Sequence, residues 1–281
     1  MLFRSAHPFD ARDEDSLADA GPTLARLGRN PRFLADLAID ELKSRCAGQA
    51  TNSYGAQVFL LRPPNGRYVL RANFWPAADD AMVRAGGGDA FFYGHAHDHN
   101  FPFLTYGYLG PGYWSDYWER DPAATIGVPG EDAGLTFLGR RRLEPGGLML
   151  YRMRRDVHRQ LPPDAFSVSL NVLAYDPAQP WVEQYRFDVE RGTVGEGLTT
   201  APSEALLALA VHLADGVDLA HHLARTHPFA RMRVTALDAL ASAEDADARR
   251  ALEVAADDAD RYVAAHARAR LDASVPDAVR R

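Results

Sequence analysis

Short β-type runs between residues 56 and 190 restrict the fold more than any other feature of this 281-residue chain. Gly and Pro residues separate them, and many short strands with regular turn signals indicate a β-barrel or a β-sandwich. The runs are AQVFLLR, RYVLRANFW, AFFYGHAH, FLTYGYL, GYWSDYWE, LTFLGRRRL, LMLYRMR, AFSVSLNVLAY and WVEQYRFDVE. The turn PPNG between the first two favours a hairpin, because Asn-Gly suits a tight turn between strands.

The run AFSVSLNVLAY alternates strictly between apolar and polar residues. Val168 and Leu170 share one face, while Ser169 and Asn171 share the other. A strand with an apolar outer face and a polar inner face is typical of a barrel that encloses a polar site. In RYVLRANFW the same alternation puts Arg71 and Asn73 on one face, although strand periodicity alone also allows an outward Arg71.

The ends of the chain have helical rather than strand patterns. We expect an N-terminal helical segment over 1–50, a β-barrel over 51–195 and a C-terminal helical region over 203–281. The C-terminal region is rich in Ala and Leu at helical spacing. Its segments RMRVTALDALAS and DRYVAAHARARL are loosely similar to HEAT-type repeats, and a protein partner could bind these helices.

Composition excludes several classes of function. A formal charge of −7, without a cluster of basic and aromatic residues, argues against nucleic-acid binding. Cys46 is the only cysteine, so neither an intrachain disulfide nor a thiolate zinc site is expected. The glycine-rich RAGGGDA lacks the spacing of a nucleotide loop. With no apolar run of membrane-spanning length and no apolar signal core, we expect a cytoplasmic protein with no membrane contact.

The stretch FFYGHAHDHNFPF carries His95, His97 and His99 at every second position. If it is extended, the three imidazoles converge on one side, and neutral imidazole is the commonest transition-metal ligand. A solvated strand face and a closed structural metal site are the alternatives, but the latter usually recruits thiolates. An open metal site needs another ligand, and His158 at the end of a strand is the best candidate.

These residues resemble the cupin family, whose small β-barrels hold a metal with a His-x-His pair, a Glu and a later His. HDHNFPFLTYGYLG is similar to the first cupin motif, with His97 and His99 as the pair and Phe103 where the family has its Glu. LEPGGLMLYRMRRDVH is similar to the second motif and ends on His158. The resemblance covers about residues 55–190. It implies a mainly β fold: a cupin double-stranded β-barrel with N-terminal helices and a C-terminal α-helical extension.

Without the Glu ligand, the metal site resembles that of the thiol dioxygenases, such as cysteine dioxygenase, which hold iron with three histidines. The resemblance implies Fe(II), with Mn, Ni or Zn as alternatives. The Ser-x-His-x-Tyr triad of that family falls at Ser169, Asn171 and Leu173, so two of its three positions have lost acid–base function. The resemblance therefore implies an oxygenase site more firmly than a thiol substrate.

Other residues are assigned from their positions around the cluster. We expect His95 to be either a fourth ligand or, preferably, an acid–base group at the pocket mouth, and Tyr106 or Tyr113 to reach the site. The remaining aromatic residues between 101 and 118 are expected to pack the barrel. The expected substrate-binding residues are Arg71, Asn73, Phe103, Ser169 and Asn171.

The function expected from these features is an Fe(II)-dependent cupin oxygenase acting on dioxygen and a small chelating substrate, either anionic or an amino acid or peptide. A metal-dependent cupin isomerase, epimerase or lyase that consumes no oxygen is the alternative. A non-enzymatic module that senses a ligand or binds a partner is the third possibility.

Overall fold

A computed structural model describes residues 9–55, 57–213 and 215–273 of the chain. The chain divides into two compact units. The first is built from Met1–Asp121 and Leu135–Gln179, and the second from Pro122–Gly134 and Pro180–Arg281. The N-terminal helices therefore belong to the same unit as the strands that follow them.

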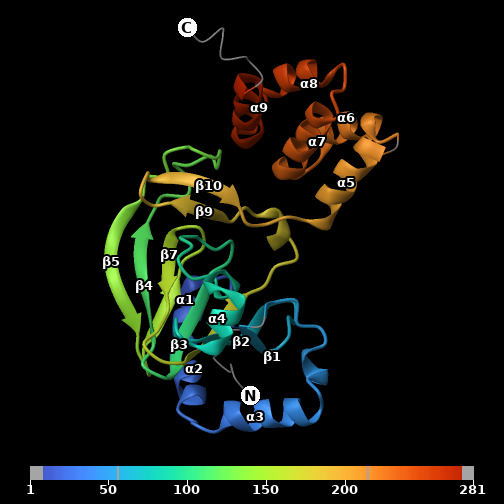
Figure 1. Ribbon diagram of the computed structural model, residues 1–281. Helices are drawn as coiled ribbons and strands as arrows, with labels where there is room; N and C mark the ends of the chain where they lie inside the picture. The colour runs from blue at the N-terminus through green and yellow to red at the C-terminus, as the bar shows by residue number, and fades with distance from the viewer. Residues whose placement is uncertain (1–8, 56, 214, 274–281) are drawn as a thin grey trace. The chain divides into compact units, whose positions relative to one another are not determined.

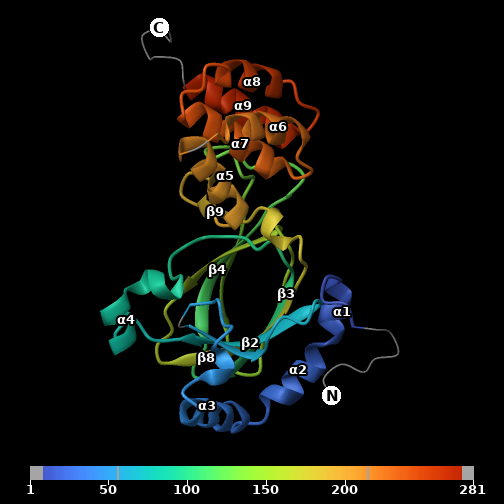
Figure 2. The same ribbon diagram turned by 90° about the vertical axis from the view of Figure 1, so that its right-hand side faces the viewer.

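Two antiparallel sheets form the first unit, with their strands arranged around a common interior (Figures 1 and 2). One sheet has the strand order β1-β2-β8-β3-β6 and the other the order β5-β4-β7. The strands are β1 (Val58–Arg62), β2 (Tyr68–Trp75), β3 (Phe103–Leu109), β4 (Tyr113–Glu119), β5 (Thr136–Leu143), β6 (Leu148–Tyr151), β7 (Asp156–Leu161) and β8 (Ser167–Ala174). The predicted hairpin over residues 56–75 is confirmed by the antiparallel pair β1 and β2.

Strand β8 has the two-faced character predicted from its sequence. Val168 and Leu170 pack in the cluster on the outer face of the five-stranded sheet. On the inner face, Ser169 accepts a hydrogen bond from Trp75, and Asn171 accepts one from Thr105. All eight residues of the strand are buried, so the alternation separates an apolar core from a polar interior rather than core from solvent.

Three helices cover the outer face of the five-stranded sheet. They are α1 (Glu14–Asp19), α2 (Gly21–Gly28) and α3 (Phe33–Lys43), and a further short helix, α4 (Ala81–Gly86), follows β2. Leu17, Leu24 and Leu34, one from each of the first three helices, share a core with the outward residues of β2, β3 and β8. Helix α3 is the least buried of the three, because Leu34 is its only buried side chain and its apolar residues Leu37, Ile39 and Leu42 are exposed.

The second unit contains a two-stranded sheet and five helices. The sheet pairs β9 (Tyr185–Asp188) with β10 (Thr193–Gly197), and the helices are α5 (Pro202–Leu213), α6 (Val217–Thr226), α7 (Ala230–Ser242), α8 (Ala248–Ala255) and α9 (Arg261–Ala273). The helices share an Ala- and Leu-rich core. None of the described helices combines the length and the apolar character that a membrane span requires.

This division differs from the predicted boundaries, because residues 1–50 share a unit with the strands, while residues 122–134 and 180–195 belong to the second unit rather than to the barrel. The run WVEQYRFDVE has a strand pattern and was expected to belong to the barrel, but β9 pairs only with β10 within the described residues. An isolated bridge between Asp132 and Thr193 then links β10 to the 122–134 segment of the same unit. A strand pattern predicts a strand but not the sheet that the strand joins.

Candidate metal centre

His97 and His99 lie in an irregular segment that precedes β3, not in a regular strand as expected. Phe92 and Gly94 have left-handed backbones, with φ of 60° and 80°, and these turns interrupt the extended conformation. The chain then forms an isolated bridge with β7, in which the amide N–H of His97 and that of His158 each donate to the carbonyl of the other, both at 3.0 Å. This bridge brings the His-x-His pair and His158 together, although about sixty residues separate them.

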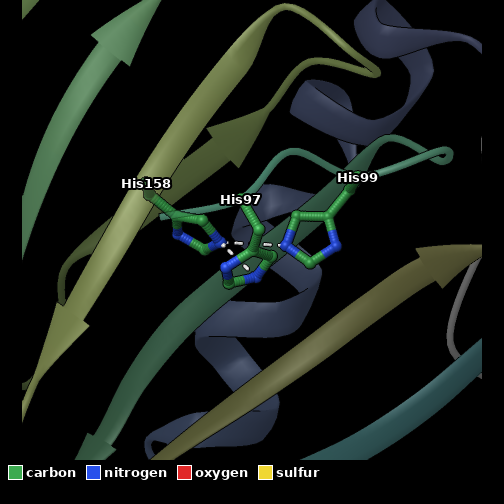
Figure 3. A group of neighbouring side chains, drawn as sticks. All are labelled: His97, His99 and His158. Carbon is green, nitrogen blue, oxygen red and sulfur yellow. Dashed lines mark hydrogen bonds between the residues drawn. The ribbon is translucent and has the colours of Figure 1, made fainter. Parts of the chain in front are cut away.

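The three imidazoles converge on one point (Figure 3). The Nε2 atom of His158 is 2.9 Å from Nε2 of His99 and 3.2 Å from Nε2 of His97. Two imidazole nitrogens at right angles on a metal about 2.1 Å away would be roughly 3.0 Å apart. Nitrogen atoms with these separations therefore suit adjacent positions on one metal ion.

Hydrogen bonds outside the cluster hold the ligand candidates in place. The carbonyl of His95 lies 2.9 Å from Nδ1 of His97, so an Nδ1–H donating to that oxygen would leave Nε2 of His97 free to bind a metal. Between the two histidines, Asp98 pairs with Arg120 at 3.4 Å, with both side chains fully buried. The amide nitrogen of Gln160 lies 3.1 Å from Nδ1 and 3.2 Å from Nε2 of His158, so this side chain packs against the ring without selecting one of its nitrogens.

Burial keeps His99 and His158 uncharged. Burial first, and then the neighbouring His97, hold the pKa of His99 and of His158 well below the ordinary value of 6.5. Both rings are therefore neutral at pH 7, which is the form that binds a metal. Among the described residues, the group that could hold a metal consists of these three histidines and contains no carboxylate.

Aromatic side chains form one wall beside the histidines. Phe103 stands edge-on to His99 with ring centroids 4.8 Å apart, and it stacks on Tyr151 at 4.3 Å. The Tyr151 ring is 4.6 Å from the ring of His158, and its hydroxyl is 2.9 Å from that of Tyr117. Burial raises the pKa of both tyrosines, so both hydroxyls stay protonated at neutral pH.

A polar wall comes from β2 and β8. In their register Arg71 is opposite Asn171, and Asn73 is opposite Ser169, so the four share the inner face. Asn73, Ser169 and Asn171 are buried, and Oδ1 of Asn73 has no hydrogen-bond partner. The Arg71 guanidinium stacks on the ring of Tyr54 at 4.6 Å. Burial lowers its pKa, and its charge is among the causes that lower the pKa of His99.

Two predicted residues lie elsewhere. The Tyr106 side chain packs on the outer face of β3, against helix α2, where a Cβ on Gly28 would collide with its ring, so the expectation that Tyr106 reaches the site is corrected. Strand alternation explains the error, because Phe103 faces inward and Tyr106, three residues on, must face outward. His95 lies outside the three-histidine group and contacts Asp89 at 2.8 Å.

Three residues at the site, Tyr151, Tyr117 and Gln160, have no predicted role there. Tyr117 and Gln160 share the inner face of the three-stranded sheet, where the register pairs Tyr117 with His158 and Ser115 with Gln160. Alternation from His158 along DVHRQL would have placed Gln160 on the same face. Nothing local in the sequence places Tyr151 against His158, since the contact is made between the two sheets.

The chain matches no protein-family model and no curated protein. Among solved structures it is similar to a DMSP lyase from Ruegeria pomeroyi DSS-3, at 15% identity over 43% of this chain and 47% of that chain, with a TM-score of 0.25. A hydroquinone 1,2-dioxygenase from Sphingomonas sp. TTNP3 matches at 9% identity, over 45% and 70%, with a TM-score of 0.28. A cupin domain from Bordetella pertussis Tohama I matches at 12%, over 43% and 95%, with a TM-score of 0.25.

The matched region spans about half the length of that lyase. At these identities and TM-scores, the likenesses carry no argument about activity. The predicted double-stranded β-barrel with helices at both ends is confirmed by the sheets and helices of the chain itself. The prediction of a mainly β chain is corrected, because the described helices contain more residues than the described strands. The thiol-dioxygenase-like subtype and the HEAT-like character of the helices stay predictions.

Proposed function

We propose that this protein is an Fe(II)-dependent cupin oxygenase that acts on a small chelating substrate, either anionic or an amino acid or peptide. One observation carries the proposal: three buried imidazoles present Nε2 atoms at metal-ligand separations, with no carboxylate in the group. Such a donor set suits iron, and also manganese, nickel and zinc.

His97, His99 and His158 would hold the metal. When bound, Fe(II) would present up to three further positions, enough for a bidentate substrate and dioxygen. Because the ligands are neutral, the site keeps the full charge of the metal and favours an anionic substrate. The aromatic wall at Phe103 and Tyr151 would exclude water from one side.

The other residues bind and orient the substrate in this proposal. Arg71 would anchor a carboxylate, because it is a cation on the inner face whose Nε has no hydrogen-bond partner. Asn73, Ser169 and Asn171 would supply hydrogen bonds beside it. His95, which holds His97 through its carbonyl, is proposed as an acid–base group at the pocket mouth.

The test is metal analysis of the purified protein, combined with oxygen uptake on a panel of thiols, amino acids and peptides. We expect stoichiometric metal and oxygen uptake only after anaerobic reconstitution with Fe(II). Equal turnover without oxygen, or with Zn²⁺ or Mg²⁺ in place of iron, would contradict the oxygenase assignment and favour the isomerase or lyase.

Replacing Arg71 tests the anchoring role. We expect Arg71→Ala to raise KM more than it lowers kcat, because an anchoring contact made equally in the ground state and the transition state contributes uniform binding. Steady-state kinetics on the best substrate of the panel would measure both constants. A fall in kcat with unchanged KM would contradict anchoring.

A further inference from the structure

A cavity of about 280 Å³ lies behind the aromatic wall of the metal centre. Tyr117 and Tyr151 line it, and their hydroxyl oxygens are 2.9 Å apart. The same two rings lie against His158, with centroids 6.4 Å and 4.6 Å from its ring. One layer of side chains therefore separates the cavity from the three histidines.

The cavity has a mixed lining, in which apolar side chains face the tyrosine hydroxyls and the charged groups of Arg141, Arg152 and Asp156. Trp118 of β4, Leu138 of β5 and Met149 of β6 contribute side chains from three strands. Opposite Tyr117 and Trp118, β5 contains a bulge with Leu138 as the extra residue. Bulges are common at barrel rims next to binding sites, where they redirect side chains.

Among the residues that the structure describes, Arg141 is the cation of this cavity without an ion-pair partner. It pairs in register with Ser115, which is fully buried between Tyr113 and Tyr117, so Arg141 points toward the inner side of β5. Its neighbours Arg140 and Arg142 point outward and pair with Asp116 and Glu144. In the part of the chain that the structure describes, no acidic side chain forms an ion pair with Arg141.

The other arginine in the cavity is already neutralised. Arg152 pairs with Asp156 at 2.5 Å and with Glu119 at 3.2 Å. The charge available for an anionic ligand is therefore that of Arg141. Arg141 lines the same cavity as Tyr117 and Tyr151, the two residues of the hydroxyl pair.

We infer that this cavity is a substrate subsite for a carboxylate carried on an apolar or aromatic group, with Arg141 as the partner of the carboxylate. Its volume lies just below the roughly 300–1,000 Å³ of complete ligand sites, which suits one end of a substrate. The inference rests on the proposed function, in which the other end of the substrate reacts at the metal centre. A ligand that extends from the metal centre into this cavity would displace the hydrogen bond between the hydroxyls of Tyr117 and Tyr151.

Phenylacetate is a suitable probe, and isothermal titration calorimetry on the metal-free full-length protein measures its binding. Arg141→Gln should raise the Kd of phenylacetate about tenfold, since a hydrogen bond to a charged group is lost. Phenylacetamide, its neutral isostere, should bind the wild-type protein more weakly and should not respond to the substitution. Arg141→Lys keeps the charge and should retain most of the affinity.

Arg142→Gln is the matched control, because it removes an arginine from the outer face of the same strand and should leave the Kd unchanged. A Kd that rises in Arg71→Ala but not in Arg141→Gln would place phenylacetate at the proposed anchor instead of this subsite. Equal Kd values for wild-type and Arg141→Gln proteins, equal binding of the acid and the amide, or no binding of phenylacetate would each overturn the inference. The measurement needs neither metal nor oxygen, so its failure is distinguishable from failure of the proposed function.

Discussion

His99 and His158 are buried beside a third imidazole, and protonation of either ring is unfavourable in the folded state. In the unfolded chain their pKa is about 6.5, so below that pH the unfolded state binds more protons than the folded state. Stability of the metal-free protein should therefore be complete above pH 6.5. It should fall as the pH drops toward the lower folded pKa, by about 1.4 kcal/mol per pH unit for each histidine.

Urea unfolding between pH 7.5 and 5 would measure this dependence. A His158→Gln variant should show a shallower fall over the same range, because one of the two depressed groups is gone. An identical slope in the variant would contradict the assignment of the pH dependence to the cluster. Saturating metal should also flatten the curve, since bound metal competes with protons for the same nitrogen atoms.

We expect metal binding to depend on the three histidines that the bridge between residues 97 and 158 brings together. We expect both the double variant His97→Ala/His99→Ala and the single variant His158→Ala to lose metal. Their metal affinity should fall by more than the roughly 10–100-fold that follows loss of a residue that only hydrogen-bonds to a ligand. The fold should persist, because the core around the site is aromatic and aliphatic.

His95→Ala is the matched control for these variants. His95 comes from the same segment but lies outside the group, and the contact with His97 uses its backbone carbonyl, which alanine retains. Native mass spectrometry should therefore find the same metal content in His95→Ala as in the wild-type protein. If the double variant His97→Ala/His99→Ala retained stoichiometric metal, the assignment of the metal site to these histidines would be wrong.

At the level of elements, the turn between β3 and β4 closes the barrel next to the polar interior. Gly112 has a φ of +83°, and a Cβ there would meet the backbone oxygen of Leu143 at 2.0 Å. Gly66, in the β1–β2 turn, has the same φ but open space around it. Gly112→Ala should thus cost roughly 2–5 kcal/mol from overpacking and strain, and Gly66→Ala about 1–2 kcal/mol from strain alone.

Chemical denaturation of both variants would measure the difference. Equal losses would show that the close approach to β5 contributes nothing beyond the left-handed conformation. A larger loss at Gly112 would assign the excess to packing between the turn and the start of the β5–β6 connection.

Elements with a strong local pattern were predictable from the sequence. The β1–β2 hairpin, the two faces of β8 and the C-terminal helices follow from turn residues and side-chain periodicity. The convergence of His97 and His99 with His158 was also anticipated, through the family resemblance. The backbone conformation that brings them together was not predicted. It depends on left-handed residues at 92 and 94 and on a bridge between distant segments, and tertiary contacts determine both.

At the scale of the molecule, the three histidines all belong to the first unit, and the helical residues 203–273 contribute none of them. The second unit has its own buried ion pair, in which Arg231 donates to both carboxylate oxygens of Glu204 at 3.0 Å. Removing one partner of a buried pair leaves an uncompensated charge and costs about 3–5 kcal/mol.

These facts predict separate responses of the two units in differential scanning calorimetry of the full chain. Metal binds only the folded first unit, so at 100 times its Kd it should stabilise that unit by about 2.7 kcal/mol and raise one unfolding transition. Arg231→Met should lower the other transition and leave the metal stoichiometry at the wild-type value. His158→Ala, in contrast, should abolish the metal-induced shift without moving the second transition. A single transition that shifts in all three experiments, or loss of metal from Arg231→Met, would show that the metal centre depends on the helical unit for its stability.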